Sequence, residues 1–539
     1  MRVKLLCLAS VLLAMAESAG AAPKPKMHVP VVKPAVAPAK PAVAGPDAAT
    51  TALTGEMSIA DLQKAMAKGD ITSEALTKAA IARIKALDGK LHAVIALNPD
   101  ALTEARDMDA ARKAGKNLGP MMGIPILVKD NVETLDPVAT TAGSLALKDN
   151  ISRRDAPLIA RLRAGGAVIL AKTNLSEWAN IRSSHAMSGW SAMGGLVHNP
   201  YELDRTACGS SSGTGAGIAA DYAVVGVGTE TDGSVTCPSS MQGLAGLKPT
   251  VGLVSRTHIV PISHSQDTAG PMGHSVADIA AMLTVMAGSD PADPATADAD
   301  AHKTDYVAAL SKDALKGVPI GVLRDEIGNE PKTAAAFEAA LQKLKDAGAV
   351  LVDIAKSDVP GLSDAENTVL MTELKADMNV YLASTPSVVK TRTLDDLIAF
   401  DKANADKEMP LFKQELFEDA EKTKGLNDAD YIAALTKDRS SQTRIDGLLK
   451  DNGVALLVAP TYAPAWLSDP VYGDIYNGPS ATSLPATAGY PHLTVPMGEV
   501  QGLPVGLSFI GPKWSEASLL RAGYAFEQVS HARKVADLK

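Results

Sequence analysis

Several residue types and patterns are scarce in this sequence, and each scarcity excludes a class of protein. The 539 residues include only 3 cysteines, too few for a small secreted module built on disulfides. Aromatic residues make up 4%, which argues against a surface on which nucleic-acid bases stack. The 52 lysines and arginines are outnumbered by 61 acidic residues, so no global basic surface for nucleic acid is expected. With 46% hydrophobic residues, the chain is typical of a globular enzyme or binding protein with a large core.

Long apolar runs are also rare, and the first residues hold a short one. Arg2 and Lys4 precede the apolar run 5–16, and small residues follow at 18–22. This order predicts a secretory signal peptide over residues 1–22, hence a secreted or periplasmic protein, with an uncleaved anchor as the alternative. No later run reaches the roughly 18 apolar residues of a membrane span, so we expect no stable membrane association after cleavage.

The next segment differs in composition from everything that follows it. Proline recurs through residues 23–50, which predicts an extended Pro/Ala-rich linker over 23–54. After Met57 helical patterns begin: Ser58 precedes apolar residues at helical spacing, and a second such pattern covers 72–87. We therefore place the folded domain over residues 55–539.

Within this domain, short strand-like runs alternate with helical stretches. The strand-like runs cover 123–129, 167–172, 223–228, 319–325, 349–354, 455–460 and 493–498. Such alternation predicts an α/β fold with a central mixed β-sheet flanked by helices. Residues of about 360–450 are charged and helical without clear strands, which predicts a helical excursion packed on the α/β body.

Two segments dense in glycine and serine are the candidates for the chemistry. They are ACGSSSGTGAG (207–217) and GTETDGS (228–234). Neither contains the lysine of a phosphate-binding P-loop or the dinucleotide pattern G-x-G-x-x-G. Residues 209–213 fit G-x-S-x-G with Ser211 as nucleophile, but a polar loop precedes them where that elbow requires an apolar strand.

These segments belong to a longer set of strings, and the set resembles the amidase signature family over residues 57–530. The strings are GIPILVKDNVET (123–134), TTAGSLAL (140–147), AVILAKTNLSEWA (167–179), CGSSSGTGAG (208–217), GVGTETDGSVTCPSSMQGLAGLKPTVGLVSR (226–256), ISHSQDTAGPM (262–272) and AGYPHLTVPMG (488–498). The variants Cys208-Gly209 and Asp232-Gly233-Ser234 resemble the bacterial peptide amidase branch more than the tRNA-dependent amidotransferase subunits.

The resemblance implies a Ser–cis-Ser–Lys triad. Matched residue by residue, Ser234 is the nucleophile, Ser210 the bridging serine after a cis peptide bond from Gly209, and Lys129 the base. A serine hydroxyl is a weak nucleophile and needs an adjacent base, and lysine serves as one only where its pKa is depressed enough to leave it neutral. Lys129 ends an apolar strand-like run, which favours burial over a surface position.

The resemblance also implies an oxyanion hole and supporting residues. Backbone N–H groups would bind the oxyanion at Thr231, Asp232, Gly233 and Ser234. Ser211 and Ser212 are expected to act as supporting hydrogen-bonding residues rather than reactants. We expect no cofactor, and the histidines show no metal-ligand spacing, so no metal site is expected either.

Two other sources of a nucleophilic site remain as alternatives. Cys208 and Cys237 flank the two loops and could pair in an oxidising compartment, but the sequence does not fix that pairing. A cysteine nucleophile would need a base partner. His492 lies late enough in the chain to serve a Ser-His-Asp triad.

The expected function is therefore hydrolysis of linear carboxamides through a Ser234 acyl-enzyme, with release of ammonia and with C-terminal peptide amides as substrates. A broader aryl or aliphatic amidase, or a cyclic-amide hydrolase, is the second enzymatic interpretation. A secreted binding protein that retains the fold without catalysis is the non-enzymatic one. Substrate walls are expected from residues 175–195 and from the helical excursion, and the oligomeric state is left open.

Overall fold

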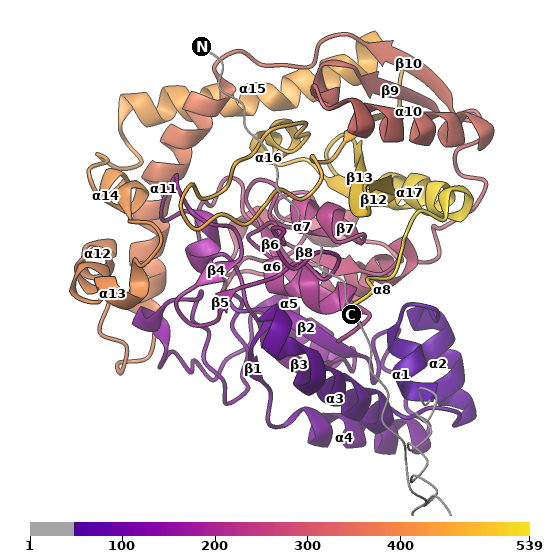
Figure 1. The fold of residues 1–539 in the computed structure, drawn as a ribbon, viewed down its shortest axis with the longest axis horizontal. Helices are drawn as coiled ribbons and strands as arrows, with labels where there is room; N and C mark the ends of the chain where they lie inside the picture. Colours follow the sequence, from indigo (N-terminus) through magenta and orange to yellow (C-terminus); the bar gives the residue numbers. More distant parts are fainter. Residues whose placement is uncertain (1–47, 539) are drawn as a thin grey trace, which may run out of the picture. The chain divides into compact units, whose positions relative to one another are not determined.

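The computed structural model describes residues 48–538, and its main feature is a large mixed sheet (Figure 1). The strands of this sheet are β1 (Val94–Leu97), β2 (Pro125–Lys129), β3 (Val168–Thr173), β6 (Val225–Glu230), β7 (Ala245–Lys248), β8 (Thr268–Gly273), β9 (Pro319–Leu323), β10 (Val350–Ile354), β11 (Leu456–Pro460), β12 (His492–Val500) and β13 (Leu503–Ile510). Their order across the sheet is β1-β3-β2-β6-β8-β7-β12-β13-β11-β9-β10. A separate small sheet pairs β4 (Trp190–Ser191) with β5 (Gly195–Leu196).

Helices flank the sheet, which confirms the predicted fold class. The α-helices are α1 (Ala48–Leu53), α2 (Ile59–Lys68), α3 (Ser73–Leu91), α4 (Ala101–Lys113), α5 (Pro157–Ala164), α6 (Ser212–Ala219), α7 (Thr236–Met241), α8 (Val276–Met286), α9 (Ala299–His302), α10 (Pro331–Asp346), α11 (Leu362–Ser384), α12 (Leu394–Ala403), α13 (Ala405–Glu408), α14 (Glu415–Glu421), α15 (Ala429–Asp451), α16 (Ser483–Ala488) and α17 (Glu516–Ser530). Short 3₁₀ helices are η1 (Leu145–Leu147), η2 (Glu177–Asn180), η3 (Pro294–Thr296) and η4 (Asp325–Ile327).

Each of the predicted strand-like runs overlaps a strand of the sheet, namely β2, β3, β6, β9, β10, β11 and β12. All residues of β2 and β3 are buried, and the two strands run parallel. Strands β9 and β10 are also parallel and are joined through α10, as expected for a βαβ unit. Antiparallel pairs such as β12 with β13 make the sheet mixed.

Strands β1, β7, β8 and β13 were not predicted, and in β7 and β8 glycine and proline interrupt the apolar sequence. Within the structure the glycines permit neighbouring segments of the same chain to approach closely. A Cβ atom on Gly270 would lie 2.0 Å from the carbonyl oxygen of Leu247, and one on Gly246 would lie 2.2 Å from Ser239 Oγ. Glycine in a strand thus serves packing here rather than strand propensity.

The N-terminal boundary of the folded body differs from the expected one. Residues 1–22 and 23–47, predicted as signal peptide and linker, lie outside the described residues. Helix α1, however, lies within the expected linker, and it buries Ala49, Ala52 and Leu53. The folded body therefore begins before residue 55. The segment 48–53 contains no proline and can therefore form a helix, and the packing of its apolar residues against the body stabilises that short helix.

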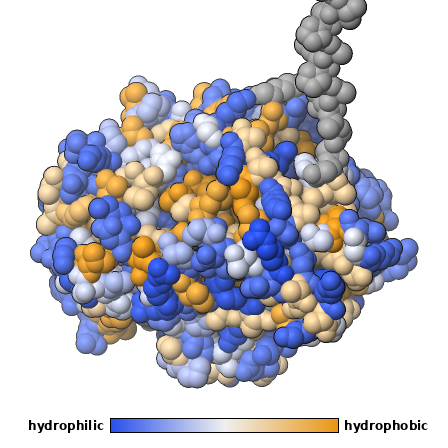
Figure 2. Space-filling view, turned by 90° about the horizontal axis from the view of Figure 1, so that it is seen from below, coloured by the Kyte–Doolittle hydropathy of each residue, from blue (hydrophilic) through white to orange (hydrophobic). Residues whose placement is uncertain are grey.

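The region predicted as a helical excursion contains α11 to α15, drawn in orange in Figure 1. A separate apolar cluster joins this region to the body, where Leu374 and Phe417 of the excursion pack with Trp178. The main core fills the space between the sheet and its covering helices. Seen from below, the surface mixes hydrophilic residues with a group of hydrophobic ones near the centre of that face (Figure 2). Among the described residues, no helix combines the length and hydrophobicity needed to cross a membrane.

Candidate active site

The three residues matched to the triad lie on neighbouring elements of the sheet. Lys129 is the last residue of β2, and β2 runs parallel to β6. Ser210 lies in the loop before α6, and Ser234 lies in the turn between β6 and α7. Because parallel strands end at the same edge of a sheet, the topology brings these loops together.

Lys129 is fully buried and is hydrogen bonded to two residues. Its Nζ lies 2.7 Å from Ser210 Oγ, 2.8 Å from Thr229 Oγ1 and 3.2 Å from the Thr229 carbonyl oxygen. Burial lowers the pKa of Lys129 to about 7, although the nearby carboxylates of Asp267 and Glu230 oppose this by raising it. A large fraction of the lysine is therefore neutral near neutral pH, as a general base requires.

Thr229 is a site residue that sequence reasoning missed. Its hydroxyl also receives the Asn131 side-chain amide at 2.9 Å, so the hydroxyl is held from two sides. Thr229 lies inside the segment 228–234 that the sequence singles out, but nothing there assigns it a role; its contact with Lys129 follows from the pairing of β6 with the strand that carries Lys129.

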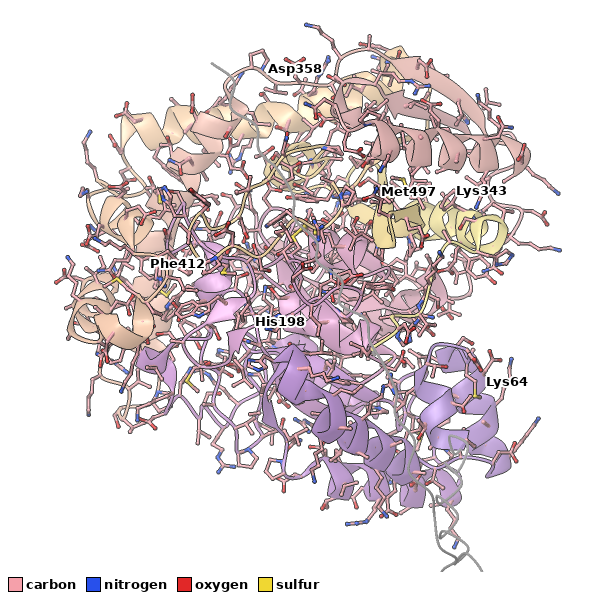
Figure 3. All side chains as sticks on the ribbon, viewed as in Figure 1. Lys64, His198, Lys343, Asp358, Phe412 and Met497 are labelled. Atoms are coloured by element: carbon pink, nitrogen blue, oxygen red, sulfur yellow. A yellow bond between two sulfur atoms is a disulfide. The ribbon has the colours of Figure 1, made fainter. Side chains whose placement is uncertain are left out.

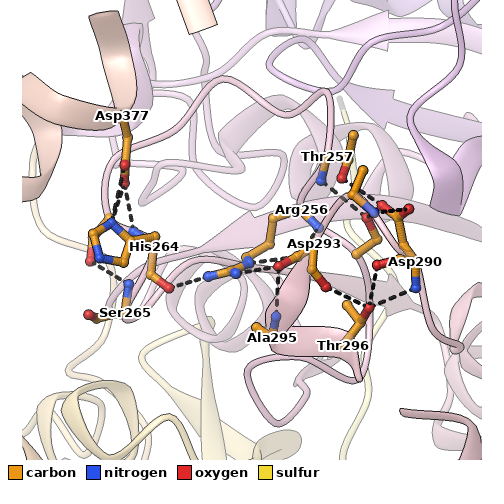
Figure 4. A network of polar contacts seen from close by, with 12 residues as sticks. Arg256, Thr257, His264, Ser265, Asp290, Asp293, Ala295, Thr296 and Asp377 are labelled. Atoms are coloured by element: carbon orange, nitrogen blue, oxygen red, sulfur yellow. Dashed lines mark hydrogen bonds and ion pairs between the residues drawn. The ribbon is translucent and has the colours of Figure 1, made fainter. Parts of the chain in front are cut away.

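Asp267 is a second residue that sequence reasoning missed, and it supplies negative charge near Lys129. Its carboxylate accepts hydrogen bonds from Thr231 Oγ1 at 2.6 Å and from the backbone N–H groups of Ile262 and Ser263. Burial raises the pKa of Asp267 to about 6 in spite of these bonds. Arg256, on the same loop between β7 and β8, pairs with Asp293 and donates to the His264 carbonyl oxygen (Figure 4).

The loop around Ser210 has the backbone geometry that the resemblance implies. The peptide bond between Gly209 and Ser210 is cis. A Cβ atom on Gly209 would lie 2.2 Å from Ser176 Oγ, so a side chain there would displace the Ser176 hydroxyl. The hydroxyl of Ser212 donates to the Cys208 carbonyl oxygen at 2.6 Å.

Ser211, the nucleophile of the alternative G-x-S-x-G interpretation, has a different environment. It is fully buried, and its hydroxyl donates to the Thr229 carbonyl oxygen at 3.1 Å and accepts the Thr229 N–H at 3.2 Å. Its hydroxyl is therefore engaged with the backbone of β6, and the bond from Lys129 goes to Ser210 instead.

Ser234 lies beside this loop and has a small exposed fraction of 8%. Its carbonyl oxygen accepts the N–H of Ser211 at 3.1 Å, which joins the two serine loops. Within the described chain, no hydrogen bond links the hydroxyls of Ser210 and Ser234.

The turn that contains Ser234 is shaped by Glu230, another residue that was not predicted. The Glu230 carboxylate accepts the N–H groups of Val235 at 2.7 Å and Thr236 at 2.9 Å. Among the hydrogen bonds of residues 48–538, none uses the N–H of residues 232–234 as donor. Gly233 has a φ of +74°, and a Cβ atom there would lie 2.8 Å from the Tyr462 hydroxyl, so glycine is required in this turn.

The two cysteines that flank the loops form a disulfide. Cys208 is joined to Cys237 with a Cα–Cα distance of 6.0 Å. The bond ties the cis-serine loop to α7, directly after the turn that carries Ser234. As a disulfide, neither sulfur is available as a nucleophile.

His492 does not take part in this constellation. It is fully buried in β12, and its Nε2 lies 2.6 Å from Ser508 Oγ. Burial lowers the pKa of His492 to about 3, and the charge of Lys248 adds to this effect. The imidazole is thus a neutral core group bonded to a different serine.

One group of side chains has the composition of a metal site, which residue spacing did not indicate. His264, Glu373 and Asp377 each place one ligand atom within 4.8 Å of the others. Glu373, however, already accepts hydrogen bonds from the hydroxyls of Ser265 at 2.6 Å and Tyr431 at 2.7 Å. Hydrogen bonds within the protein thus already satisfy its carboxylate.

Comparisons with other proteins show what the chain resembles. A family model described as Amidase matches residues 75–520. A probable amidase of Arabidopsis thaliana is 35% identical over 492 residues, which cover 89% of this chain and 91% of the plant protein. An amidase family protein from Bacillus anthracis, known from its crystal structure, is 34% identical with a TM-score of 0.82, over 91% of this chain and 94% of that one. The X-ray structure of native peptide amidase from Stenotrophomonas maltophilia is 46% identical with a TM-score of 0.86, over 90% of this chain and 99% of that one.

Proposed function

Because this chain belongs to the amidase family, whose members hydrolyse C–N bonds in amides, we propose that it removes the terminal amide group of peptides as ammonia. The likeness to a peptide amidase over 90% of the chain supports this choice of substrate. It also agrees with the motif variants at 208–209 and 232–234, which favour the same branch.

We propose Lys129, Ser210 and Ser234 as the catalytic residues. A neutral amine has two N–H donors and one lone pair. The two oxygens of Thr229 are placed to accept the N–H donors, which directs the lone pair towards Ser210, 2.7 Å away. Lys129 then accepts the Ser210 proton while Ser210 accepts that of Ser234. In this proposal the hydrogen bond between the Ser210 and Ser234 hydroxyls forms on substrate binding, because catalytic hydrogen bonds often tighten in the enzyme–substrate complex.

The Ser234 oxygen attacks the carboxamide carbon to form a tetrahedral intermediate. We propose that the N–H groups of Thr231, Asp232, Gly233 and Ser234 stabilise its oxyanion; that no hydrogen bond of the described chain uses the N–H groups of residues 232–234 supports this. The relay returns the proton to the leaving nitrogen, so the C–N bond breaks, ammonia departs and an ester to Ser234 remains. Water then attacks this ester by the same route and yields the free peptide acid and the Ser234 hydroxyl.

The observation that carries this mechanism is the buried lysine bonded to the cis serine. A charged lysine would be costly there, and a pKa of about 7 leaves it able to accept a proton. In the described chain no histidine is bonded to Ser210 or Ser234, so the lysine is the base that the geometry offers.

A digest of amidated peptides tests the proposed function. We expect stoichiometric ammonia and a product of unchanged length in which the terminal amide has become an acid. Shortened fragments would contradict it by showing cleavage within the peptide. Unreacted peptide amides beside hydrolysed small aryl amides would contradict it too and favour the broader amidase.

We also propose that the enzyme works outside the cytoplasm. The Cys208–Cys237 disulfide supports an oxidising compartment, where such bonds persist. The charged, apolar and small-residue pattern of 1–22, which lies outside the described residues, supports export. Periplasmic or secreted fractions of the source cells should therefore contain the activity, and an activity confined to the cytoplasm would contradict the proposal.

A further inference from the structure

A large pocket lies away from the triad, at the junction of the helical excursion and the body. Its volume is about 900 Å³, and three segments line it: 183–187, 402–418 and 469–473. Phe412, between α12 and α14, is one of its lining residues (Figure 3). Lys129, Ser210 and Ser234 do not line it, so it is not the catalytic centre itself.

The pocket combines an apolar wall with charged side chains of both signs. The Phe412 ring meets Trp190 edge to face at 5.3 Å, and the Arg182 guanidinium lies 4.5 Å from the ring centre. Among the charged lining residues, Lys402 pairs with Glu418 at 2.9 Å. The lining contains charges of both signs, the two lysines Lys402 and Lys413 and the three carboxylates of Glu415, Glu418 and Asp469, so neither sign dominates strongly and the pocket favours an uncharged ligand.

The lining segment 469–473 exposes two large apolar side chains next to each other. Val471 is 79% exposed and Tyr472 72%. The turn that presents them is held by Asp469, whose carboxylate accepts the N–H of Val471 at 2.8 Å and of Tyr472 at 3.1 Å. Large apolar side chains presented together on an ordered surface mark a binding site.

The same segment connects the pocket to the turn that carries Ser234. Tyr462 lies against Gly233, and the Tyr462 ring meets Tyr476 edge to face at 5.6 Å. Tyr476 in turn meets Trp466 at 5.8 Å. An aromatic row thus extends from the catalytic turn along the loop between β11 and α16, which reaches towards α14 in Figure 1.

The far end of this row is fixed to the pocket wall by a shared carboxylate. Asp474 accepts the Trp466 indole N–H at 3.0 Å and the Ser188 N–H at 3.1 Å. Its neighbour Gly473 lines the pocket, and a Cβ atom on Gly473 would lie 2.8 Å from the His185 carbonyl oxygen. The catalytic turn and the pocket are therefore joined by one continuous, packed surface.

We propose that this surface is the subsite for the acyl side of the substrate, and that the pocket binds a large uncharged side chain of the peptide. This inference rests on the proposed function. A terminal carboxamide has only NH₂ as its leaving group, so any surface that extends from the catalytic turn must receive the acyl part. An extended chain covers roughly 3.3–3.6 Å per residue, so the side chain that reaches a pocket outside the triad belongs to the second residue from the amide or one farther away.

A substrate series tests the subsite. The substrates are acetylated tetra-alanine amide and four derivatives in which one alanine is replaced by phenylalanine, and kcat/KM is measured from ammonia release. With the unmodified enzyme, phenylalanine at one position beyond the first should raise kcat/KM about tenfold or more, the scale expected for burying an aromatic ring.

Variants then assign the gain to this pocket. Leu411 and Tyr472 line it and are partly or largely exposed, so serine is tolerated at both. In the double variant Leu411→Ser/Tyr472→Ser, the ratio of kcat/KM for the preferred phenylalanine derivative to kcat/KM for the tetra-alanine amide should fall about tenfold, to near unity. Val350→Ser, on the exposed edge strand β10, is the matched control and should keep the ratio of the unmodified enzyme.

The outcomes separate this inference from the proposed function. A ratio near unity at every position in the unmodified enzyme, with all peptide amides hydrolysed, overturns the subsite alone. A normal ratio in the double variant overturns its assignment to this pocket. Failure to release ammonia from any peptide amide, while small aryl amides react, overturns the proposed function itself.

Discussion

Replacing Asp267 by asparagine should shift the pH dependence of catalysis to lower pH. Lys129 must be neutral to accept the Ser210 proton, so kcat/KM rises as pH increases through the Lys129 pKa of about 7. The Asp267 carboxylate stabilises the charged form of Lys129 and so raises this pKa. Removing that negative charge disfavours the charged lysine, and the acid limb of the profile should move downwards.

The structure bounds the size of this shift. A nearby opposite charge moves a pKa by roughly 1–3 units. Since the pKa of Asp267 is itself about 6, its carboxyl is mostly but not fully ionised where Lys129 titrates. We therefore expect the lower end of that range, an acid limb about one unit lower in Asp267→Asn.

The assay is kcat/KM for ammonia release across the pH range in which Lys129 titrates. Asp290→Asn is the control, because this aspartate is also hydrogen bonded on the same face, to Ser255 at 2.7 Å and Thr257 at 2.6 Å, without acting on Lys129. Both variants should remain folded by circular dichroism. An acid limb that stays in place or moves upwards in Asp267→Asn would refute the assignment of Lys129 as the titrating base.

Three further predictions concern neighbours of the triad. Thr229→Val removes the hydroxyl that orients Lys129 and should lower kcat/KM about tenfold, whereas Thr229→Ser should retain activity; equal losses in both would contradict the orienting role. Replacing Cys208 and Cys237 by serine opens a link between positions 29 residues apart and should lower the free energy of unfolding by about 3–4 kcal/mol in denaturant titrations; an unchanged midpoint would contradict this. His492→Gln should change kcat only a few-fold, because the imidazole is bonded to Ser508; a loss of about a thousandfold, the scale for a triad member, would restore the histidine alternative.

The parts of the fold that sequence predicted are those in which local pattern and tertiary environment agree. Strand β2 is apolar up to its final lysine and fully buried, so its sequence and its place in the sheet point the same way. Strands β7 and β8 lie equally deep, but their glycines serve close chain approach, as at Gly270 against the Leu247 carbonyl. Their position depends on a partner that is distant in sequence, which no local pattern reveals.

The candidate site was predicted from sequence motifs, so the prediction included only residues to which a motif assigns a role. Lys129 and Ser210 could be named from strings in the chain, and the structure brings them to 2.7 Å. Thr229 and Asp267 act through a hydroxyl and a charge that become neighbours of Lys129 only in the folded sheet. Both residues lie inside strings that carry the resemblance, 226–256 and 262–272, but those strings assign them no role, so only the three-dimensional arrangement shows what they contact.

The central claim is that Ser234 is the nucleophile activated by Lys129 through Ser210. The most direct measurement is to inactivate the enzyme with a serine-reactive phosphonate probe, above the pKa of Lys129, and to map the adduct by mass spectrometry. The account predicts one adduct per chain on the peptide that contains Ser234, slow labelling in Lys129→Ala, and no adduct in Ser234→Ala. An adduct on Ser211, or labelling that persists in Ser234→Ala, would contradict it.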